Sequence, residues 1–296
     1  MNSDVIQLGI VGLDGHGPVF AKEVNSPGAD YGAKVIAAMP VPSVMVSQEV
    51  LANNVEETHK LGIEIVDEPE KLASGVDGLL ILHDDGSRHL DLLKRFVNCG
   101  KPVFVDKPLE VTAAKARELA ELCRANQCPV FTASALRFCP EVQEILTRCE
   151  AGGIISAMSY SPYFARPTMP GWIYYAIHAV EHLYALMGPD CREVHCIASD
   201  SGPVAIGTWQ DGRMGIAKAM SQGPPAYGFT VWSDKDIHAV SVNVDTIYSG
   251  LLKSIMDFVK TGSSPVSIDE SVEVIGFLQA ANESMAQSGK TVTIKR

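Results

Sequence analysis

The sequence contains little positive charge. It has 24 Lys and Arg residues against 35 Asp and Glu residues, a formal net charge of −11 over 296 residues. Nucleic-acid binding requires clustered Lys and Arg, and no such cluster occurs, so we expect no nucleic-acid partner. No stretch approaches the roughly 20 apolar residues of a membrane span, so we expect no membrane partner. Residues 1–7 lack a basic segment followed by an apolar one, which favours a cytoplasmic protein over an exported one.

The cysteines do not form a recognisable framework. There are seven, an odd number, and no two of them make a C-x-x-C pair. In a chain of this length such scatter is typical of reduced thiols rather than of structural disulfides. Cys123, Cys128, Cys139 and Cys149 are therefore expected to fill helix faces rather than to bind a metal.

Two patterns of secondary structure divide the chain. Up to about residue 131, short β-branched runs alternate with helical stretches, which predicts an α/β domain with a parallel sheet. Beyond it, strands at 192–199, 204–210, 213–220, 227–233 and 237–242 follow one another directly, with helices at 174–187, 246–261 and 269–288. Such strands indicate an open, mainly antiparallel sheet in an α+β domain. We predict a Rossmann-like dinucleotide-binding domain at 1–131 and a substrate-binding and oligomerisation domain at 132–296.

The stretch GIVGLDGHGP, residues 9–18, lies where a dinucleotide-binding loop would place its glycines. Gly12 and Gly17 hold the outer positions, but Asp14 replaces the middle glycine, and a carboxylate there would repel phosphate unless it turns away or a cation intervenes. Ligands bind at the carboxyl ends of parallel strands. The cofactor-binding candidates at these ends are Gly12, Leu13, Asp14, Gly15, His16, Gly17, His83, Asp84, His89, Asp106, Lys107 and Pro108.

Several segments resemble one family. GKPVFVDKPLEVT at 100–112 resembles the E-K-P signature of the glucose-fructose oxidoreductase and inositol 2-dehydrogenase (Gfo/Idh/MocA) family, with Asp106 in place of glutamate. Residues 87–103 resemble its histidine-bearing helix, 135–145 its R-F-x-P segment, and 258–294 its last helix and strand. The order and spacing of these motifs make the resemblance specific, and it covers nearly the whole chain.

This resemblance implies an oxidoreductase that transfers hydride between a nicotinamide cofactor, NAD or NADP, and a hydroxyl of a sugar, a polyol or a related substrate. It places Lys107 between nicotinamide and substrate, where a lysine can orient a hydroxyl and stabilise alkoxide charge. It also predicts a cis peptide between Lys107 and Pro108. Residues 35–43 lack both the acid that would bind an NAD ribose and an arginine suited to the NADP phosphate.

A second catalytic segment is expected at 171–188, GWIYYAIHAVEHLYALMG. Family members typically have D-x-x-x-H here, and His182 matches that histidine while His178 takes the place of the aspartate. Two histidines four residues apart share a helix face, and an imidazole titrates near neutral pH. We therefore predict catalytic roles for both, with His182 as the proton-transfer group.

The same segment also fits a metal-binding pattern. HAVEH fits the H-x-x-E-H pattern of some zinc hydrolases, in which the two histidines hold the metal and Glu181 would act as base. A non-proteolytic metal site using His178, His182 and an acid such as Asp85 or Asp106 is a further alternative. Because the family resemblance explains the flanking sequence, our first reading has no metal.

Further residues are expected to face the substrate. These are Arg137, Tyr163, Arg166, Trp172 and Tyr175, whose side chains can hold hydroxyls or carboxylates. The resemblance implies a sugar-like small molecule as substrate and a homodimer or homotetramer formed through open sheet faces. The mostly apolar alternation in 204–210 and 214–220 fits a buried sheet face.

Two classes of function stay open. One is an NAD(P)-dependent oxidoreductase that uses Lys107 and His182. The other is a relative with a degenerate cofactor loop that acts as a ligand-binding or regulatory protein, or as a metal-assisted lyase or hydrolase. Carboxylates at Asp14, Asp84 and Asp85, beside a dianionic cofactor, favour the second class, whereas Lys107 and His182 favour the first.

Overall fold

A computed structural model describes residues 5–149 and 153–295. Two segments lie outside the described residues. Residues 1–4 belong to the stretch in which no export signal is expected, and residues 150–152 are at the end of an expected helix. The chain divides into two compact units. Unit 1 comprises Met1–Glu110, Ala114–Thr132 and Leu252–Ile268, and unit 2 comprises Val111–Ala113, Ala133–Leu251 and Asp269–Arg296. Leu252–Ile268 thus groups with unit 1, although the sequence assigned it to the second domain.

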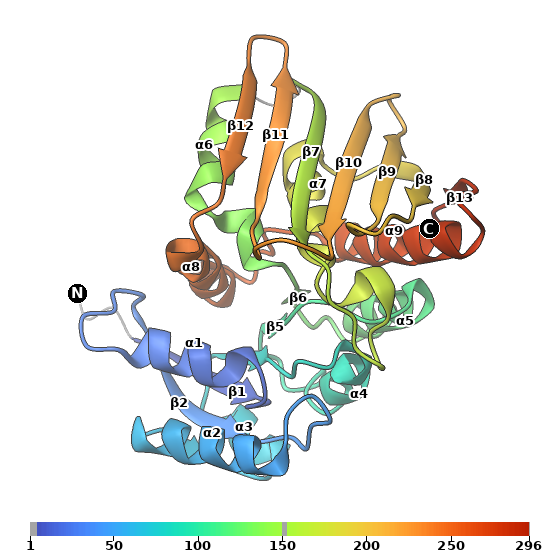
Figure 1. Cartoon of the computed structure of the whole chain (residues 1–296). Helices are drawn as coiled ribbons and strands as arrows, with labels where there is room; N and C mark the ends of the chain where they lie inside the picture. The colour runs from blue at the N-terminus through green and yellow to red at the C-terminus, as the bar shows by residue number, and fades with distance from the viewer. Residues whose placement is uncertain (1–4, 150–152, 296) are drawn as a thin grey trace. The chain divides into compact units, whose positions relative to one another are not determined.

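Unit 1 is built on a six-stranded parallel sheet with the order β3-β2-β1-β4-β5-β6 (Figure 1). β4 and β5 are continuous apolar runs in which every residue is buried, as expected for parallel strands with both faces covered. The predicted parallel α/β architecture is confirmed. The strands are β1 (Ile6–Val11), β2 (Ala33–Met39), β3 (Glu64–Ile65), β4 (Gly78–Ile81), β5 (Val103–Val105) and β6 (Val130–Phe131).

The helices of unit 1 fill the crossovers between its strands and pack closely on the sheet. Gly78 marks one close approach, because a Cβ there would lie 2.5 Å from Val259 Cγ2. Phe258 packs edge-on against Phe131, with ring centroids 4.8 Å apart. These contacts explain why the end of α8 belongs to unit 1. The helices are α1 (His16–Asn25), α2 (Gln48–Lys60), α3 (Pro69–Ser74), α4 (His89–Lys94), α5 (Ala113–Ala125) and α8 (Ile247–Thr261), which starts in unit 2.

Unit 2 contains a seven-stranded sheet with the order β12-β11-β7-β10-β9-β8-β13 (Figure 1). All pairs are antiparallel except β7 with β10, which confirms the predicted, mainly antiparallel sheet. The strands are β7 (Ile154–Pro162), β8 (Cys191–Ile197), β9 (Val204–Trp209), β10 (Met214–Met220), β11 (Gly228–Ser233), β12 (Ile237–Ser241) and β13 (Val292–Thr293).

The two faces of this sheet differ in burial. On one face Ala205, Trp209 and Ala217 are buried. On the other face the registered neighbours Thr230, Met158, Ile216 and Ile206 form a row of partly exposed residues across four strands. Unit 2 therefore presents a partly apolar sheet face that its own helices do not bury.

The helices of unit 2 are α6 (Pro140–Cys149), α7 (Ile177–Met187) and α9 (Ile268–Ala286). α7 is buried almost all round, since nine of its eleven residues are buried. It starts three residues later than expected, because Gly171–Ile173 forms a separate 3₁₀ turn. α7 and α9 meet through Tyr184 and Phe277, with ring centroids 6.2 Å apart. The expected helix at 269–288 is confirmed to within two residues.

His182 lies in the buried part of α7. It is fully buried, its ring packs edge-on against Phe229 at 5.3 Å, and neither ring nitrogen has a hydrogen-bond partner among the described residues. Burial, assisted by the charge of Arg137, lowers the pKa of His182 to about 3. The folded protein therefore holds this imidazole in its neutral form.

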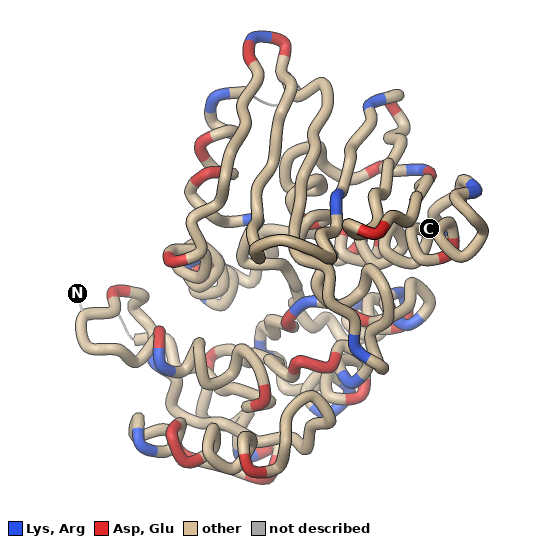
Figure 2. The backbone as a smooth tube through the Cα atoms, in the orientation of Figure 1, with Lys and Arg blue, Asp and Glu red and all other residues tan. Residues whose placement is uncertain are grey.

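The charges show no segregation by sign. Lys and Arg are interspersed with Asp and Glu along the chain (Figure 2). Within the part of the chain that the structure describes, no helix combines the length and apolarity needed to cross a bilayer.

The burial of His182 predicts that the free energy of unfolding falls at low pH. A depressed folded-state pKa means that full stability holds above the ordinary pKa of 6.5 and is lost as pH falls toward about 3. At roughly 1.36 kcal/mol per pKa unit, the loss by pH 4.5 is about 2–3 kcal/mol. As the pH falls from 7.5 to 4.5, the free energy of unfolding of His182→Leu should therefore rise by about this much relative to that of the wild type. Urea unfolding of both proteins at several pH values measures it, and a pH-independent difference would contradict the assignment.

Candidate active site

The loop between β1 and α1 is a tight glycine turn. Gly12 has φ +96°, and a Cβ there would lie 2.7 Å from the backbone nitrogen of His83. A Cβ on Gly17 would lie 2.1 Å from the Gly12 carbonyl oxygen, so both positions require glycine. α1 begins at His16, and no side chain caps its first turn. Its first amides therefore point toward the loop as donors for an anion.

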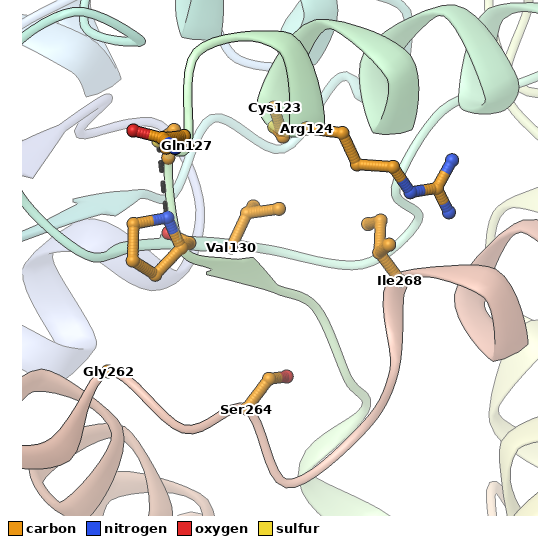
Figure 3. Close-up of a pocket in the computed structure, with 9 residues that line it drawn as sticks. Cys123, Arg124, Gln127, Val130, Gly262, Ser264 and Ile268 are labelled. Carbon is orange, nitrogen blue, oxygen red and sulfur yellow. Dashed lines mark hydrogen bonds between the residues drawn. The ribbon is translucent and has the colours of Figure 1, made fainter.

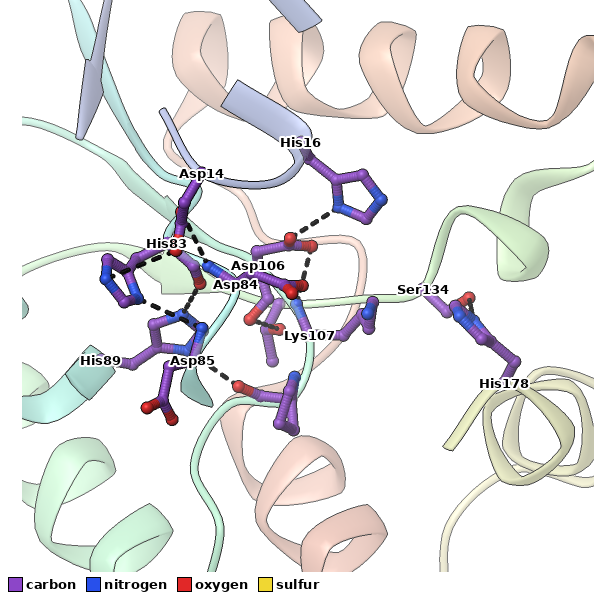
Figure 4. A network of polar contacts seen from close by, with 12 residues as sticks. Asp14, His16, His83, Asp84, Asp85, His89, Asp106, Lys107, Ser134 and His178 are labelled. Carbon is purple, nitrogen blue, oxygen red and sulfur yellow. Dashed lines mark hydrogen bonds and ion pairs between the residues drawn. The ribbon is translucent and has the colours of Figure 1, made fainter. Parts of the chain in front are cut away.

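Asp14, in the place of the middle glycine, turns away from this turn. Its side chain is buried, Oδ1 accepts a hydrogen bond from the Asp84 amide at 3.1 Å, and Oδ2 lies 3.5 Å from His83 Nε2 (Figure 4). The carboxylate is thus directed at the loop after β4. Of the possibilities that the sequence left open, the side chain turning away is the one observed.

The histidines after β4 connect backbone segments. His83 Nδ1 accepts the Asp85 amide at 3.1 Å, which leaves Nε2 to donate to the Pro42 carbonyl at 3.2 Å. His89 is fully buried, and its ring nitrogens lie 2.7 Å from the His83 carbonyl and 2.8 Å from the Pro108 carbonyl. These contacts fix the loop after β4 against the loops after β2 and β5. His83 and His89 therefore hold these loops together, and their roles in cofactor binding stay predictions.

Asp106 ends β5 as a buried carboxylate. Oδ2 lies 2.6 Å from His16 Nδ1, and Oδ1 accepts the Lys107 amide at 2.8 Å (Figure 4). Burial alone would raise the pKa of Asp106, but the His16 imidazole and then the Lys107 charge lower it to about 2. Lys107 itself is buried, and its peptide bond to Pro108 is cis, as expected. We call His16, Asp106 and Lys107 the Asp106 cluster.

The residues of unit 1 fit a dinucleotide. The glycine turn admits close backbone approach, the first turn of α1 has no side-chain cap, and the Asp14 carboxylate is turned away. Leu13 is buried beneath the loop, and Asp84 is half-buried beside it. At the end of β2, residues 39–43 carry no charged side chain.

In unit 2, His178 stands at the start of α7 and is half-buried. Its Nδ1 lies 2.7 Å from Ser134 Oγ (Figure 4), and the rings of Tyr175 and Tyr227 flank it edge-on at 5.2 and 5.6 Å. We call Ser134, Tyr175, His178 and Tyr227 the His178 cluster. Sequence reasoning missed Ser134 and Tyr227, which lie 44 and 49 residues from the histidine in the chain with no local motif to mark them.

An ion-pair network holds Ser134 in place. The Ser134 amide and Arg137 Nη1, the latter at 2.9 Å, both donate to the Glu181 carboxylate, and Arg137 Nη2 pairs with Glu270. Burial raises the pKa of Glu181 to about 7 although Arg137 opposes the rise. Arg137 is itself buried. Arg137 is thus bonded to two carboxylates within unit 2, and its role in substrate binding stays a prediction.

The other substrate candidates differ in exposure. Trp172 is fully buried, Tyr163 packs edge-on against it at 6.5 Å, and the Arg166 guanidinium lies 5.2 Å from the centre of the Tyr174 ring. Among the five predicted residues, Tyr175 contacts His178, with ring centroids 5.2 Å apart. Roles in substrate binding stay predictions for Tyr163, Arg166, Trp172 and Tyr175.

The metal alternatives gain no support from the side-chain positions. Across residues 5–149 and 153–295, no three His, Cys, Asp or Glu side chains form a group that could hold a metal ion. His178 is half-buried and bonded to Ser134, whereas His182 is fully buried against Phe229. The two imidazoles of the HAVEH stretch thus occupy unlike environments.

Comparison with known proteins identifies the first part of the chain. Residues 6–134 match the Gfo/Idh/MocA model, described as an oxidoreductase family with an NAD-binding Rossmann fold. The rhizopine catabolism protein MocA of Rhizobium meliloti is 27% identical over 146 residues, which is 49% of this chain and 43% of MocA. The match therefore spans less than half the length of this curated relative.

Solved structures match nearly the whole chain. A probable dehydrogenase from Thermotoga maritima has a TM-score of 0.81 at 19% identity, with coverage of 98% of this chain and 99% of that one. A putative myo-inositol dehydrogenase from Sinorhizobium meliloti has a TM-score of 0.80 at 17% identity, and the match covers 98% of this chain and 100% of that one. The scyllo-inositol dehydrogenase of Lactobacillus casei, solved with NAD(H) and scyllo-inositol, has a TM-score of 0.79 at 16% identity, and the match covers 98% of this chain and 99% of that one. Residues 6–134 thus match the model of the Gfo/Idh/MocA oxidoreductase family, and the chain shares the fold of these dehydrogenases.

Proposed function

We propose that the protein is an NAD(P)-dependent oxidoreductase acting on a hydroxyl of a cyclic polyol, a sugar or a related compound. The observation that carries the proposal is the Asp106 cluster at the carboxyl end of β5, beside a glycine turn whose carboxylate faces away. The family match of residues 6–134 and the inositol dehydrogenases among the similar structures support the same assignment.

The cofactor would be held mainly by backbone. The amides of Gly15, His16 and Gly17 would bind the pyrophosphate at the first turn of α1. When bound, a nicotinamide cofactor supplies the group that accepts or donates hydride. Since residues 39–43 offer neither an acid nor an arginine, we propose that side chains at this strand end do not set the choice between NAD and NADP.

Lys107 would stabilise negative charge on the substrate oxygen that reacts. Asp106 is ionised and paired with His16, so it does not need Lys107 as its sole counter-charge. A buried ammonium can donate a hydrogen bond to the substrate hydroxyl and stabilise negative charge that develops on its oxygen. In the reverse direction the same ammonium would polarise a carbonyl.

For proton transfer we favour His178 over His182. A general base must accept a proton near neutral pH, and the burial that lowers the pKa of His182 to about 3 opposes this. His178 is half-buried, and the bond between its Nδ1 and Ser134 fixes the orientation of the imidazole. The original assignment to His182 stays a prediction, and the variants below separate the two.

The His178 cluster also suits a ring-shaped alcohol. Tyr175 and Tyr227 place aromatic rings edge-on beside the imidazole, and their side chains are hydrogen-bonded to each other. Aromatic rings can pack on the C–H face of a polyol ring while their hydroxyls bond to its oxygens. A screen of inositols, sugars and sugar acids with NAD and NADP would identify the substrate.

The cofactor loop gives the first test. A carboxylate about 4 Å from phosphate would cost roughly 1–4 kcal/mol, so its removal would tighten binding about fivefold or more. Because Asp14 faces away, Asp14→Asn should leave the Kd for NAD and NADP almost unchanged, as measured by fluorescence titration. Clear tightening would show that the carboxylate faces pyrophosphate. If the wild-type protein binds neither nucleotide at millimolar concentration, the oxidoreductase proposal is contradicted and the non-redox alternative is favoured.

The two histidines give the second test. His178→Gln should lower kcat about 10²–10⁴-fold, the range for loss of a general base, while the Kd for cofactor stays near wild type. His182→Leu keeps the interior apolar and should retain most of the turnover. The pH dependence of kcat/KM should lose its lower limb only in the His178 variant. The opposite pattern would return proton transfer to His182.

The open sheet face gives the third test. We propose that unit 2 forms a homodimer or homotetramer through the row of Thr230, Met158, Ile216 and Ile206, since association covers apolar surface. Ile216→Glu would bury an unpaired charge at the interface and should shift the protein to monomer in light scattering at micromolar concentration. Val50→Glu, on the exposed face of α2, is the matched control. A monomeric wild type would contradict this proposal.

A further inference from the structure

Helix α5 ends in a cap that places two cysteines side by side. Gln127 has φ +51°, its amide donates to the Arg124 carbonyl at 3.2 Å, and the Cys128 amide donates to the Cys123 carbonyl at 3.0 Å. These two bonds and the left-handed residue between them define a Schellman motif, in which the residue after the turn packs on the third residue from the helix end. Here those two residues are Cys128 and Cys123.

The two sulfur atoms interact directly. The Cys123 thiol donates a hydrogen bond to the Cys128 sulfur, and this bond is the largest cause that lowers the pKa of Cys128 and raises that of Cys123. The Cys128 thiol also has two carbonyl acceptors, the Lys101 oxygen at 3.9 Å and the Pro129 oxygen at 3.8 Å. The two thiols are thus within hydrogen-bonding reach of each other, which is the proximity that an S–S bond requires.

A surface cavity of about 340 Å³ opens beside the pair (Figure 3). Cys123 lies on the last turn of α5 at its edge, together with the chain-reversing residue Gln127 (Figure 3). Cys123 and Cys128 both line the cavity although each residue is buried overall. The cavity therefore offers a small oxidant a path from the surface to these two residues.

We propose that Cys123 and Cys128 form a reversible redox site that closes to an intrachain disulfide. In the reaction the two thiols lose two protons and two electrons as the S–S bond forms. Hydrogen peroxide takes them up to give two water molecules, and a diazene oxidant such as diamide takes them up to give the hydrazine. The bond closes a loop of only a few residues, which adds little chain-entropy stabilisation, so a thiol reductant should reverse it readily.

Cys99 is the competing partner. It is half-buried in the same unit, and its interaction with Cys128 contributes to the rise in its pKa, of which burial is the main cause. No backbone bond of the α5 cap involves Cys99, however, whereas the cap joins Cys123 to Cys128 directly. The other four cysteines, Cys139, Cys149, Cys191 and Cys196, are buried in unit 2.

The sequence allows a direct test, because trypsin cleaves after Arg124, between the two cysteines. Folded full-length protein is treated with diamide, its remaining thiols are alkylated, and it is denatured and digested. We expect mass spectrometry to show residues 118–124 linked to residues 125–137, with the loss of two of the seven titratable thiols. Dithiothreitol should restore both thiols.

Single variants identify the pair. Cys123→Ser and Cys128→Ser should each abolish the linked peptides, and Cys99→Ser should leave them unchanged. Circular dichroism before and after oxidation verifies that the helix is intact in every sample. Folded wild type that yields no linked peptides, or a link from Cys128 to Cys99, would overturn the proposal. The test requires no nucleotide or substrate, so its result is independent of the proposed oxidoreductase activity.

Discussion

The hydrogen bond between the Asp106 carboxylate and the His16 imidazole is the interaction on which the arrangement of unit 1 depends. A carboxylate buried at the end of β5 would be costly without a partner, and removing one partner of such a pair typically costs about 3–5 kcal/mol. His16 supplies the partner from the first turn of α1. The pair thus joins the start of the helix, where an anion would bind, to the strand end that carries Lys107.

The same principle applies to the acids that made the cofactor loop look unsuitable. Asp14 bonds to the Asp84 amide and lies beside His83, while Asp85 caps the following 3₁₀ turn through the Ser87 amide. Each carboxylate of Asp14 and Asp85 is thus directed at backbone donors of its own unit. A count of charges along the sequence overstates the negative potential at the loop, because it ignores where those charges are directed.

Much of the fold followed from the sequence, since it depends on local patterns. The alternation of strands and helices predicted the parallel sheet, the uninterrupted strands predicted the antiparallel one, and the K-P pair predicted a cis peptide at Lys107. The environments of the site residues did not follow. His178 and His182 share a motif and a helix, yet Ser134 bonds to one and Phe229 covers the other. Both neighbours lie more than 40 residues away, where no spacing rule reaches.

The network around Glu181 shows how such distant contacts act on chemistry. Glu181 accepts bonds from Arg137 and from the Ser134 amide, so the residue that orients His178 is itself held by a buried acid one turn along α7. Glu270 binds the other side of Arg137, and with two carboxylates sharing one guanidinium, burial keeps the pKa of Glu181 near 7. Protonation of Glu181 would weaken its hold on the Ser134 amide without breaking the Arg137–Glu270 pair. The orientation of His178 is thereby linked to a group that titrates near the pH at which an imidazole exchanges protons.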